Sequence, residues 1–362
     1  MGVETKRLQY VDVVKGIAIV MVVFYHLLAP CLGKTIINHL MDPFLVSFFF
    51  FSGFFYKPGK RSVGESIKNR AKSLMVPFFR YSLFFWLVGT IYLVATESET
   101  IKEAFLCLRN FLCGCIWNRV IQDWFGWEYY SLGKRYFFLA DFWFLLSMLF
   151  ASILFFLIAD WALCSRAKAL LTVLLLFVVT GICQNFSVSL PYNIQLVPYW
   201  TAFMLLGAFA GQQKLFELPS LSNAARWGAG AALLITGIVV CMVKEPSPNQ
   251  FRGSFGENEV VSMLCCIAAG ILVIWGLGLL CRMAEQSGAR VKEVAWLGSH
   301  SLIIYLYHMF FAWIICIITG FSIRYEEPTD AGTIAKSVLL TAACLGLTII
   351  RNMIEDRLKK HQ

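Results

Sequence analysis

The stretch V-D-V-V-K-G-I-A-I-V-M-V-V-F-Y-H-L-L-A-P, residues 11–30, decides the fold of this chain. A helix of roughly 20 apolar residues is long enough to cross the hydrocarbon core of a bilayer. The run contains only three side chains that are charged or titrate near neutral pH, which are Asp12, Lys15 and His26. A cleavable leader has a shorter apolar core and a small-residue cleavage site, so residues 11–30 indicate a permanent membrane helix.

The rest of the chain is similarly rich in long apolar segments. Of its 362 residues, 59% are hydrophobic and 15% are charged, and its mean hydropathy is +0.69. Soluble domains are nearer 45–50% apolar and about 25% charged. We therefore predict an all-α, polytopic membrane protein with about ten transmembrane helices, built as a single membrane domain over residues 1–362 with no separate soluble domain. The predicted spans lie near residues 10–30, 41–56, 74–95, 136–159, 168–185, 194–212, 226–243, 259–281, 295–319 and 332–350.

The charges between these runs predict the orientation. The net charge of +9 comes from basic residues in short loops, which membrane topology explains better than nucleic-acid binding. With the N-terminus in the cytoplasm, the cytoplasmic segments hold about twice as many Lys and Arg residues as the outer segments. This excess predicts that both termini are cytoplasmic, in a multi-pass protein of the inner (plasma) membrane with lipid as its solvent.

The longest predicted outer loop, residues 96–135, is rich in aromatic side chains. They are Trp117, Trp124, Phe125, Trp127, Tyr129 and Tyr130. These rings fit either an aromatic belt at the headgroups or a platform on which a sugar stacks. Within the loop, residues 103–117 are apolar but interrupted by Arg109, which predicts an interfacial or re-entrant helix. Cys113 and Cys115 form a C-x-C without a second ligand pair, so we predict no metal site.

The first apolar run carries the strongest chemical signal. Ionisable groups inside a span are costly and usually functional. Lys15 and His26 are eleven residues apart, so on an α-helix they share one face, roughly 16 Å apart along the axis. Asp12 precedes Lys15 by three positions and can pair with it. A histidine suits proton abstraction near neutral pH, so we predict His26 and Asp12 as catalytic. Alternatively, the charged pair lies at the interface and His26 bonds a neighbouring helix.

Four stretches of the chain carry a family resemblance. Residues 7–26 (R-L-Q-Y-V-D-V-V-K-G-I-A-I-V-M-V-V-F-Y-H), 48–55 (F-F-F-F-S-G-F-F), 142–145 (F-W-F-L) and 297–308 (L-G-S-H-S-L-I-I-Y-L-Y-H) resemble, in this order, the membrane acyltransferase-3 family. The resemblance spans essentially the whole chain. It implies an O-acyltransferase that acts on a polysaccharide or other cell-envelope glycan, with acetyl-CoA as the donor substrate and no permanently bound cofactor.

The resemblance also implies residues for the donor. The family's pattern of a basic residue eleven positions before a histidine matches Lys15 and His26, although the family commonly has arginine at the basic position. Lysine keeps the charge and loses the bidentate fork. A basic motif before the third span is implied as well, and here Lys68, Arg70 and Lys72 would hold the phosphates of coenzyme A. Ordinary positive-inside charges explain the same three residues.

Further residues are candidates for the acceptor site. Trp143, Tyr305 and His308 lie in the matching stretches and are candidates for contacts with a sugar. His308 alternatively orients or supplements the catalytic site, and Trp143 and His308 also fit positions at the membrane interface. Ser52 and Gly53 form a small pair that favours close helix packing. A nucleophilic Ser52 would instead need a base such as His308 beside it, as in an intramembrane protease.

We therefore expect a membrane O-acyltransferase. It would move an acetyl group from cytoplasmic acyl-CoA to a hydroxyl of a glycan or lipid-linked saccharide on the outer side. The alternative is a polytopic transporter or flippase for a glycan or lipid precursor, which would be favoured by broken helices in matching positions of two halves. The sequence shows no such repeat.

Overall fold

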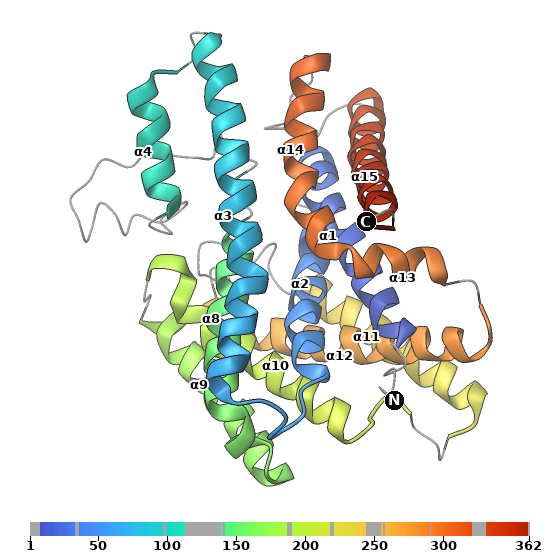
Figure 1. Cartoon of the computed structure of the whole chain (residues 1–362). Coiled ribbons are helices and arrows are strands. Elements are labelled where there is room, and N and C mark those ends of the chain that lie inside the picture. Colours follow the sequence, from blue (N-terminus) through green and yellow to red (C-terminus); the bar gives the residue numbers. More distant parts are fainter. Residues whose placement is uncertain are drawn as a thin grey trace. The chain divides into compact units, whose positions relative to one another are not determined.

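The described residues fold mainly into helices (Figure 1). The computed structural model describes residues 8–32, 36–96, 99–112, 139, 142–186, 190–217, 221–243, 255, 258–289, 291–320 and 331–360, and contains no strand among them. The elements are α1 (Gln9–Leu32), α2 (Ile36–Phe54), α3 (Val63–Ala95), α4 (Ile101–Leu112), α8 (Trp143–Ala162), α9 (Arg166–Asn185), the 3₁₀ helix η1 (Pro191–Leu196), α10 (Val197–Gln212), α11 (Asn223–Val243), α12 (Glu259–Gln286), α13 (Lys292–Ser299), α14 (Ser301–Thr319) and α15 (Ala331–Lys360).

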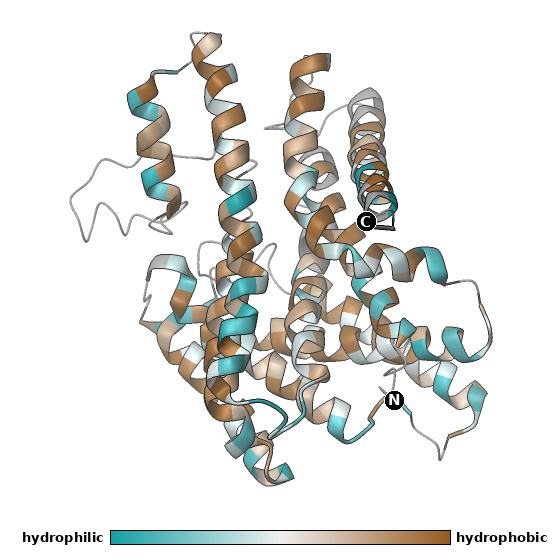
Figure 2. Cartoon of the chain, viewed as in Figure 1, coloured by the Kyte–Doolittle hydropathy of each residue, from teal (hydrophilic) through white to brown (hydrophobic). Residues whose placement is uncertain are grey.

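The helices confirm the predicted polytopic membrane fold. Within the part of the chain that the structure describes, eight helices are long and apolar enough to cross a bilayer, and two shorter apolar helices cover Met41–Phe54 and Val338–Ile354. Each of the ten predicted spans overlaps a described helix, and residues 136–138, 140 and 141 of the fourth span lie outside the described residues. Figure 2 shows that apolar residues dominate most of these helices. Along α9, large apolar side chains are exposed, as expected of a surface that faces lipid; they are Leu170, Leu171, Leu174, Leu175, Val178 and Ile182.

The third and ninth predicted spans differ most from the structure. The ninth, residues 295–319, is wrong as one helix, because the chain breaks at His300 between α13 and α14. The third begins eleven residues earlier than predicted, since the basic stretch before it is also helical. Ser62 caps this longer α3 by accepting a hydrogen bond from the Glu65 N–H at 3.2 Å, which stabilises a helix start in a polar sequence.

The described part of the segment predicted as an interfacial or re-entrant helix is helical, and its place relative to the membrane stays a prediction. Residues 101–112 form α4, which is amphipathic and carries Arg109 beside Asn110. The Trp86 indole N–H of α3 donates to the Ala104 carbonyl of α4 at 3.0 Å, so the two helices are held side by side. The aromatic residues from Trp117 to Tyr130, and the Cys113–Cys115 pair, lie outside the described residues.

The chain divides into two compact units that alternate along the sequence. The first comprises Met1–Phe51, Gln212–Ser247 and Leu264–Gln362, and the second comprises Ser52–Gly211 and Pro248–Met263. The prediction of a single membrane domain is not tested by this division and stays a prediction.

In the first unit, α1 packs against α13, α14 and α15. An aromatic cluster of Phe50, Phe216 and Trp275 fills its interior, with ring centroids 5.6–6.3 Å apart. Such contacts between rings add to the packing of buried apolar surface.

In the second unit, α3 packs against α8 and α4, while α8 and α9 both contact η1. Helix α10 is buried along nearly its whole length. The largest fully buried side chains of this unit are aromatic, and they are Trp200, Tyr199, Phe85, Phe111, Phe142, Phe155 and Phe203.

Candidate active site

The predicted stripe of ionisable residues lies on one continuous helix. Asp12, Lys15 and His26 all belong to α1, and Asp12 is buried while Lys15 and His26 are half-buried. The predicted pairing of Asp12 with Lys15 stays a prediction. What the sequence did not predict is which helix covers this region of α1.

That helix is α13, and the two backbones touch through glycine. A Cβ atom on Gly298 would lie 1.8 Å from the Asp12 carbonyl oxygen, and one on Gly16 would lie 2.1 Å from the Val294 carbonyl oxygen. Any side chain at either position would overlap backbone atoms of the partner helix. Residues 7–26 and 297–308 are two of the four stretches that resemble the acyltransferase-3 family. Through these glycines the two stretches pack directly together in the first unit.

The same packing brings two histidines into contact. His26 of α1 and His308 of α14 have ring centroids 5.3 Å apart with planes tilted by 46°. The Tyr25 ring meets His26 edge-on at 5.1 Å. His308 is fully buried, with 0% of its surface exposed, and its Nδ1 lies 2.7 Å from the Tyr305 carbonyl oxygen. Of the predicted residues in this unit, His26, His308 and Tyr305 are thus brought together.

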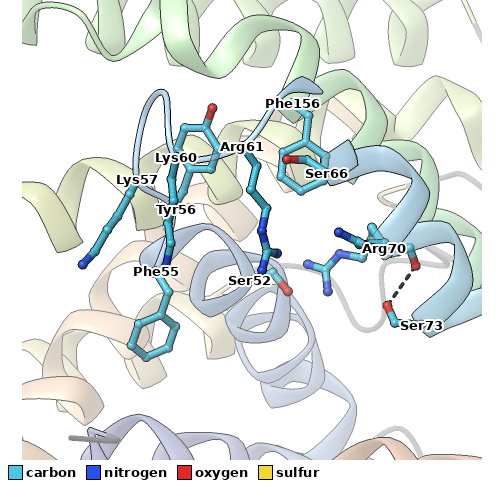
Figure 3. Close-up of a pocket in the computed structure, with 11 residues that line it drawn as sticks. Ser52, Phe55, Tyr56, Lys57, Lys60, Arg61, Ser66, Arg70, Ser73 and Phe156 are labelled. Carbon is cyan, nitrogen blue, oxygen red and sulfur yellow. Dashed lines mark hydrogen bonds between the residues drawn. The ribbon is translucent and has the colours of Figure 1, made fainter. Parts of the chain in front are cut away.

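The second unit holds a cavity of a different kind, with a volume of about 370 Å³. Four cationic side chains line it, and none of the described lining residues is acidic. They are Lys57, Lys60, Arg61 and Arg70. Polar and aromatic side chains complete the wall, namely Ser52, Ser66, Asn69, Ser73, Phe55, Tyr56 and Phe156. We call this the basic cavity. Figure 3 shows the Arg61 and Arg70 side chains extending towards Ser52.

The fork of Arg70 is held in place from α8. Its Nε–H donates to the Ser152 hydroxyl at 3.1 Å, and that hydroxyl donates to the Met148 carbonyl oxygen at 2.6 Å. Ser52 in turn contacts the Met148 sulfur at 3.6 Å. The bond through Nε leaves the terminal guanidinium nitrogens of Arg70 for an anion, and a guanidinium fork matches phosphate oxygens in geometry.

One further contact closes the rim of the basic cavity. The Tyr56 hydroxyl donates to Asp160 Oδ1 at 2.8 Å. Burial, together with this carboxylate, raises the pKa of the Tyr56 phenol above its usual value. The Tyr56 ring also packs on Phe155, with centroids 5.0 Å apart. The loop between α2 and α3 is thereby tied to α8.

Comparison with known proteins decides the family. The model of an acyltransferase domain matches residues 8–351, nearly the whole chain. The chain belongs to the acyltransferase-3 family. No curated protein and no solved structure matches it. The resemblance drawn from the four sequence stretches is confirmed, and the protein is a multi-pass membrane acyltransferase.

The donor residues expected of this acyltransferase divide into two groups. Arg70 lines the basic cavity, whereas Lys68 and Lys72 are exposed and are not among its lining residues. Periodicity explains the difference, because Lys68 and Lys72 are one turn apart on α3 and Arg70 lies between them on another face. The donor role of Lys68 and Lys72 stays a prediction, as does that of Lys15.

The acyltransferase also contains candidates that the sequence reasoning did not single out. The loop that precedes α3 carries a basic cluster, K-P-G-K-R over residues 57–61, which contains Lys57, Lys60 and Arg61. This local density of positive charge is the sequence feature that could have identified them. Asp42 is 2% exposed in the apolar helix α2. Asp42 could have been identified as a candidate from the sequence, because a carboxylate inside a membrane span is usually functional.

The remaining predicted positions lie in the second unit. Trp143 is half-buried at the start of α8 and its ring lies 5.9 Å from that of Trp200. Gly53 allows close packing, since a Cβ atom there would lie 2.0 Å from the Met204 carbonyl oxygen. This contact agrees with the packing interpretation of the Ser52–Gly53 pair, and Ser52 additionally faces the basic cavity.

Proposed function

We propose that this acyltransferase moves an acetyl group from cytoplasmic acetyl-CoA to a hydroxyl of a glycan or lipid-linked saccharide on the outer side of the plasma membrane. His26 is the residue that handles the acceptor proton, and the basic cavity binds the phosphates of the donor. Both termini lie in the cytoplasm in this proposal.

The observation that carries the donor assignment is the charge of the basic cavity. Four cations line its wall, and only Arg61 among them has an ion pair with a described carboxylate, an exposed one with Glu65 at 3.7 Å. The cations repel one another, and an anionic ligand relieves that repulsion. Coenzyme A carries several phosphate charges at one end and its thioester at the other. The Arg70 fork, anchored at Nε by Ser152, suits a bidentate contact with a phosphate group. The aromatic rings in the wall supply apolar surface for the rest of the nucleotide.

The transfer itself needs a base and no metal. A neutral His26 takes the proton of the acceptor hydroxyl as its oxygen attacks the thioester carbonyl carbon. The carbon–sulfur bond then breaks, and the proton on His26 passes to the sulfur, so that the products are the ester and free coenzyme A. Alternatively, His26 attacks the thioester first and carries the acetyl group to the acceptor. Incubation with labelled acetyl-CoA in the absence of acceptor separates the two routes, because only the second leaves label on the protein.

A saccharide acceptor is supported by the family and by aromatic side chains. Sugar rings stack on indole and phenol faces, and Trp143 beside Trp200 offers such a face in the second unit. Tyr305 of the first unit lies next to the histidine pair, where a phenol can contact an acceptor hydroxyl. Both contacts remain part of the proposal.

Two experiments test this proposal, and both compare the wild-type protein with His26→Ala. The first measures acetyl transfer by the purified proteins in proteoliposomes loaded with acetyl-CoA. The second is mass spectrometry of surface glycans from cells with and without each version of the gene, which is expected to show one acetyl group that depends on His26. Transfer is expected to fall by about 10³-fold in His26→Ala, within the range for loss of a general base, while the protein remains in the membrane. His300→Ala is the matched control and is expected to leave transfer unchanged. Full transfer by His26→Ala would overturn the assignment.

A further inference from the structure

The second histidine of the pair needs an explanation of its own. His308 is fully buried in the first unit, and burying a polar imidazole is costly unless its nitrogens serve as hydrogen-bonding groups. It lies beside His26 because α1 packs against α14 as well as against α13. Gly16 and Gly298 let the α1 and α13 backbones touch, and α14 follows α13 directly after the break at His300.

The hydrogen bond to Tyr305 determines the tautomer of His308. Its Nδ1 lies 2.7 Å from the Tyr305 carbonyl oxygen. A carbonyl oxygen only accepts hydrogen bonds, so Nδ1 must carry the hydrogen. In a neutral imidazole the other nitrogen, Nε2, then has a lone pair and acts as an acceptor.

The His308 ring, which carries this Nε2 lone pair, lies next to the ring of His26. The ring centroids of His26 and His308 are 5.3 Å apart, a separation at which nitrogens of the two rings come within reach of one hydrogen bond. His26 is half-buried and His308 has no exposed surface. A substrate can therefore reach His26, whereas His308 acts on the reaction only through its neighbour.

We propose that His308 is a positioning residue that fixes the tautomer of His26. A small rotation of the His26 ring brings one of its N–H groups to Nε2 of His308, which accepts a hydrogen bond from it, and the other nitrogen of His26 then presents its lone pair to the substrate. When His26 takes up the acceptor proton, the same hydrogen bond stabilises the imidazolium. The inference rests on the proposed function of His26, and it applies equally whether His26 is the base or carries the acetyl group.

Two substitutions of His308 separate positioning from packing. In His308→Gln, the amide oxygen reaches the place of Nε2 and keeps an acceptor there. In His308→Asn, the shorter amide reaches only the place of Nδ1 and keeps the bond to the Tyr305 carbonyl. We expect kcat to fall about 100-fold in His308→Asn with KM for acetyl-CoA unchanged, and His308→Gln to retain at least a tenth of the wild-type kcat. Thermal unfolding of the two variants is expected to be similar.

His300→Asn is the matched control. His300 makes the same kind of bond, from Nδ1 to the Trp296 carbonyl oxygen at 2.9 Å, and its ring packs on Trp296. We expect this variant to keep the wild-type kcat. Equal losses in His308→Asn and His308→Gln, or losses that follow the unfolding temperature, would overturn the positioning role. Loss in His26→Ala together with full activity in His308→Asn would sink this inference alone, and activity in His26→Ala would sink the proposed function.

A measurement on the unmodified protein keeps the inference testable if the variants do not fold. The chain has five histidines, few enough for ¹⁵N-labelled histidine to be resolved by solid-state NMR in bilayers. The expected spectrum contains a histidine that is protonated at Nδ1 and whose Nε2 also shows a correlation across an N–H···N bond to a second ring; His300 is expected to be protonated at Nδ1 without that correlation. Absence of that correlation would rule out the proposed hydrogen bond.

Discussion

The histidine pair of the first unit and the basic cavity of the second unit are built in opposite ways. The pair is formed where α1 packs against α14, on the same α1 helix whose backbone touches α13, and one of its rings has no exposed surface. The cavity is formed by long cationic side chains around an open volume of about 370 Å³, several of them from an exposed loop. Close backbone packing fixes atoms within tenths of an ångström, whereas long side chains adapt to a ligand.

This difference assigns different tasks to the two regions. A group that moves a proton must be held in one orientation, because a small displacement is costly in rate. A group that binds a phosphate tolerates movement, because charge attraction falls off gradually with distance. Substitutions in the first region are therefore expected to affect kcat and folding, and substitutions in the second to affect KM for the donor.

The largest effect is expected from Gly298→Ala. Its new Cβ would lie 1.8 Å from the Asp12 carbonyl oxygen, and backbone atoms cannot rotate out of the way. The α1 and α13 helices must separate, at a cost of about 3 kcal/mol or more, which also disturbs the register of the histidine pair. We expect a lower yield of folded protein and a loss of transfer of about 100-fold or more, measured on the purified, monodisperse fraction.

Gly346→Ala is the matched control for this prediction. Gly346 lies in α15, and a Cβ atom there meets nothing within 4 Å. Alanine has the higher helix propensity, by up to about 1 kcal/mol, so this variant is expected to unfold at the same or a higher temperature. If Gly298→Ala behaves as Gly346→Ala does, the backbone contact does not determine the position of the pair.

A smaller effect, confined to KM, is expected from Arg70→Ala. Loss of a charge-assisted hydrogen bond costs about 1.5–3 kcal/mol, so KM for acetyl-CoA should rise about 30-fold while kcat stays within about threefold. The wild-type KM should also rise with ionic strength, since salt screens exposed charges. Initial rates of transfer at several donor and salt concentrations provide both values.

Three exposed cations test whether the cavity, rather than positive charge in general, binds the donor. Lys68→Ala and Lys72→Ala change charges next to Arg70 in sequence but outside the cavity wall. Arg166→Ala removes an exposed charge at the start of α9. If the cavity alone binds the donor, contrary to the sequence-based prediction for Lys68 and Lys72, all three variants leave KM within about twofold, as for other weak surface charges. A rise in KM as large as that of Arg70→Ala would favour a diffuse basic surface over the cavity.

The sequence predicted the first region better than the second. The ten apolar runs and the position of His26 on the first helix follow from length and helical periodicity alone. Periodicity does not say which helices are neighbours, so the contact between His26 and His308 could not be derived. Gly16 and Gly298 gave no separate signal, because glycine is common in membrane helices for several reasons.

The basic cavity was only partly predictable for a related reason. Arg70 was a candidate by resemblance, but its Ser152 partner lies 82 positions away in the sequence. The K-P-G-K-R loop appeared as ordinary topology-determining charge, since its fold against α8 depends on the Tyr56–Asp160 bond. The break at His300 was missed because both halves of the predicted ninth span are apolar.

The smallest effect concerns that bond at the rim of the cavity. Tyr56→Phe removes the hydrogen bond to Asp160, and for an exposed contact we expect a loss of about 0.5–1 kcal/mol in unfolding free energy. The pKa of the Tyr56 phenol is raised in the folded protein, so its contribution is fully present below the ordinary tyrosine pKa of about 10 and is lost only as pH rises through the higher folded value. The gap between wild type and Tyr56→Phe in thermal unfolding should therefore be the same at pH 7 and pH 9 and shrink at more alkaline pH. A gap that closed between pH 7 and pH 9 would mean that the phenol ionises early, and that the loop is not held to α8 through this proton.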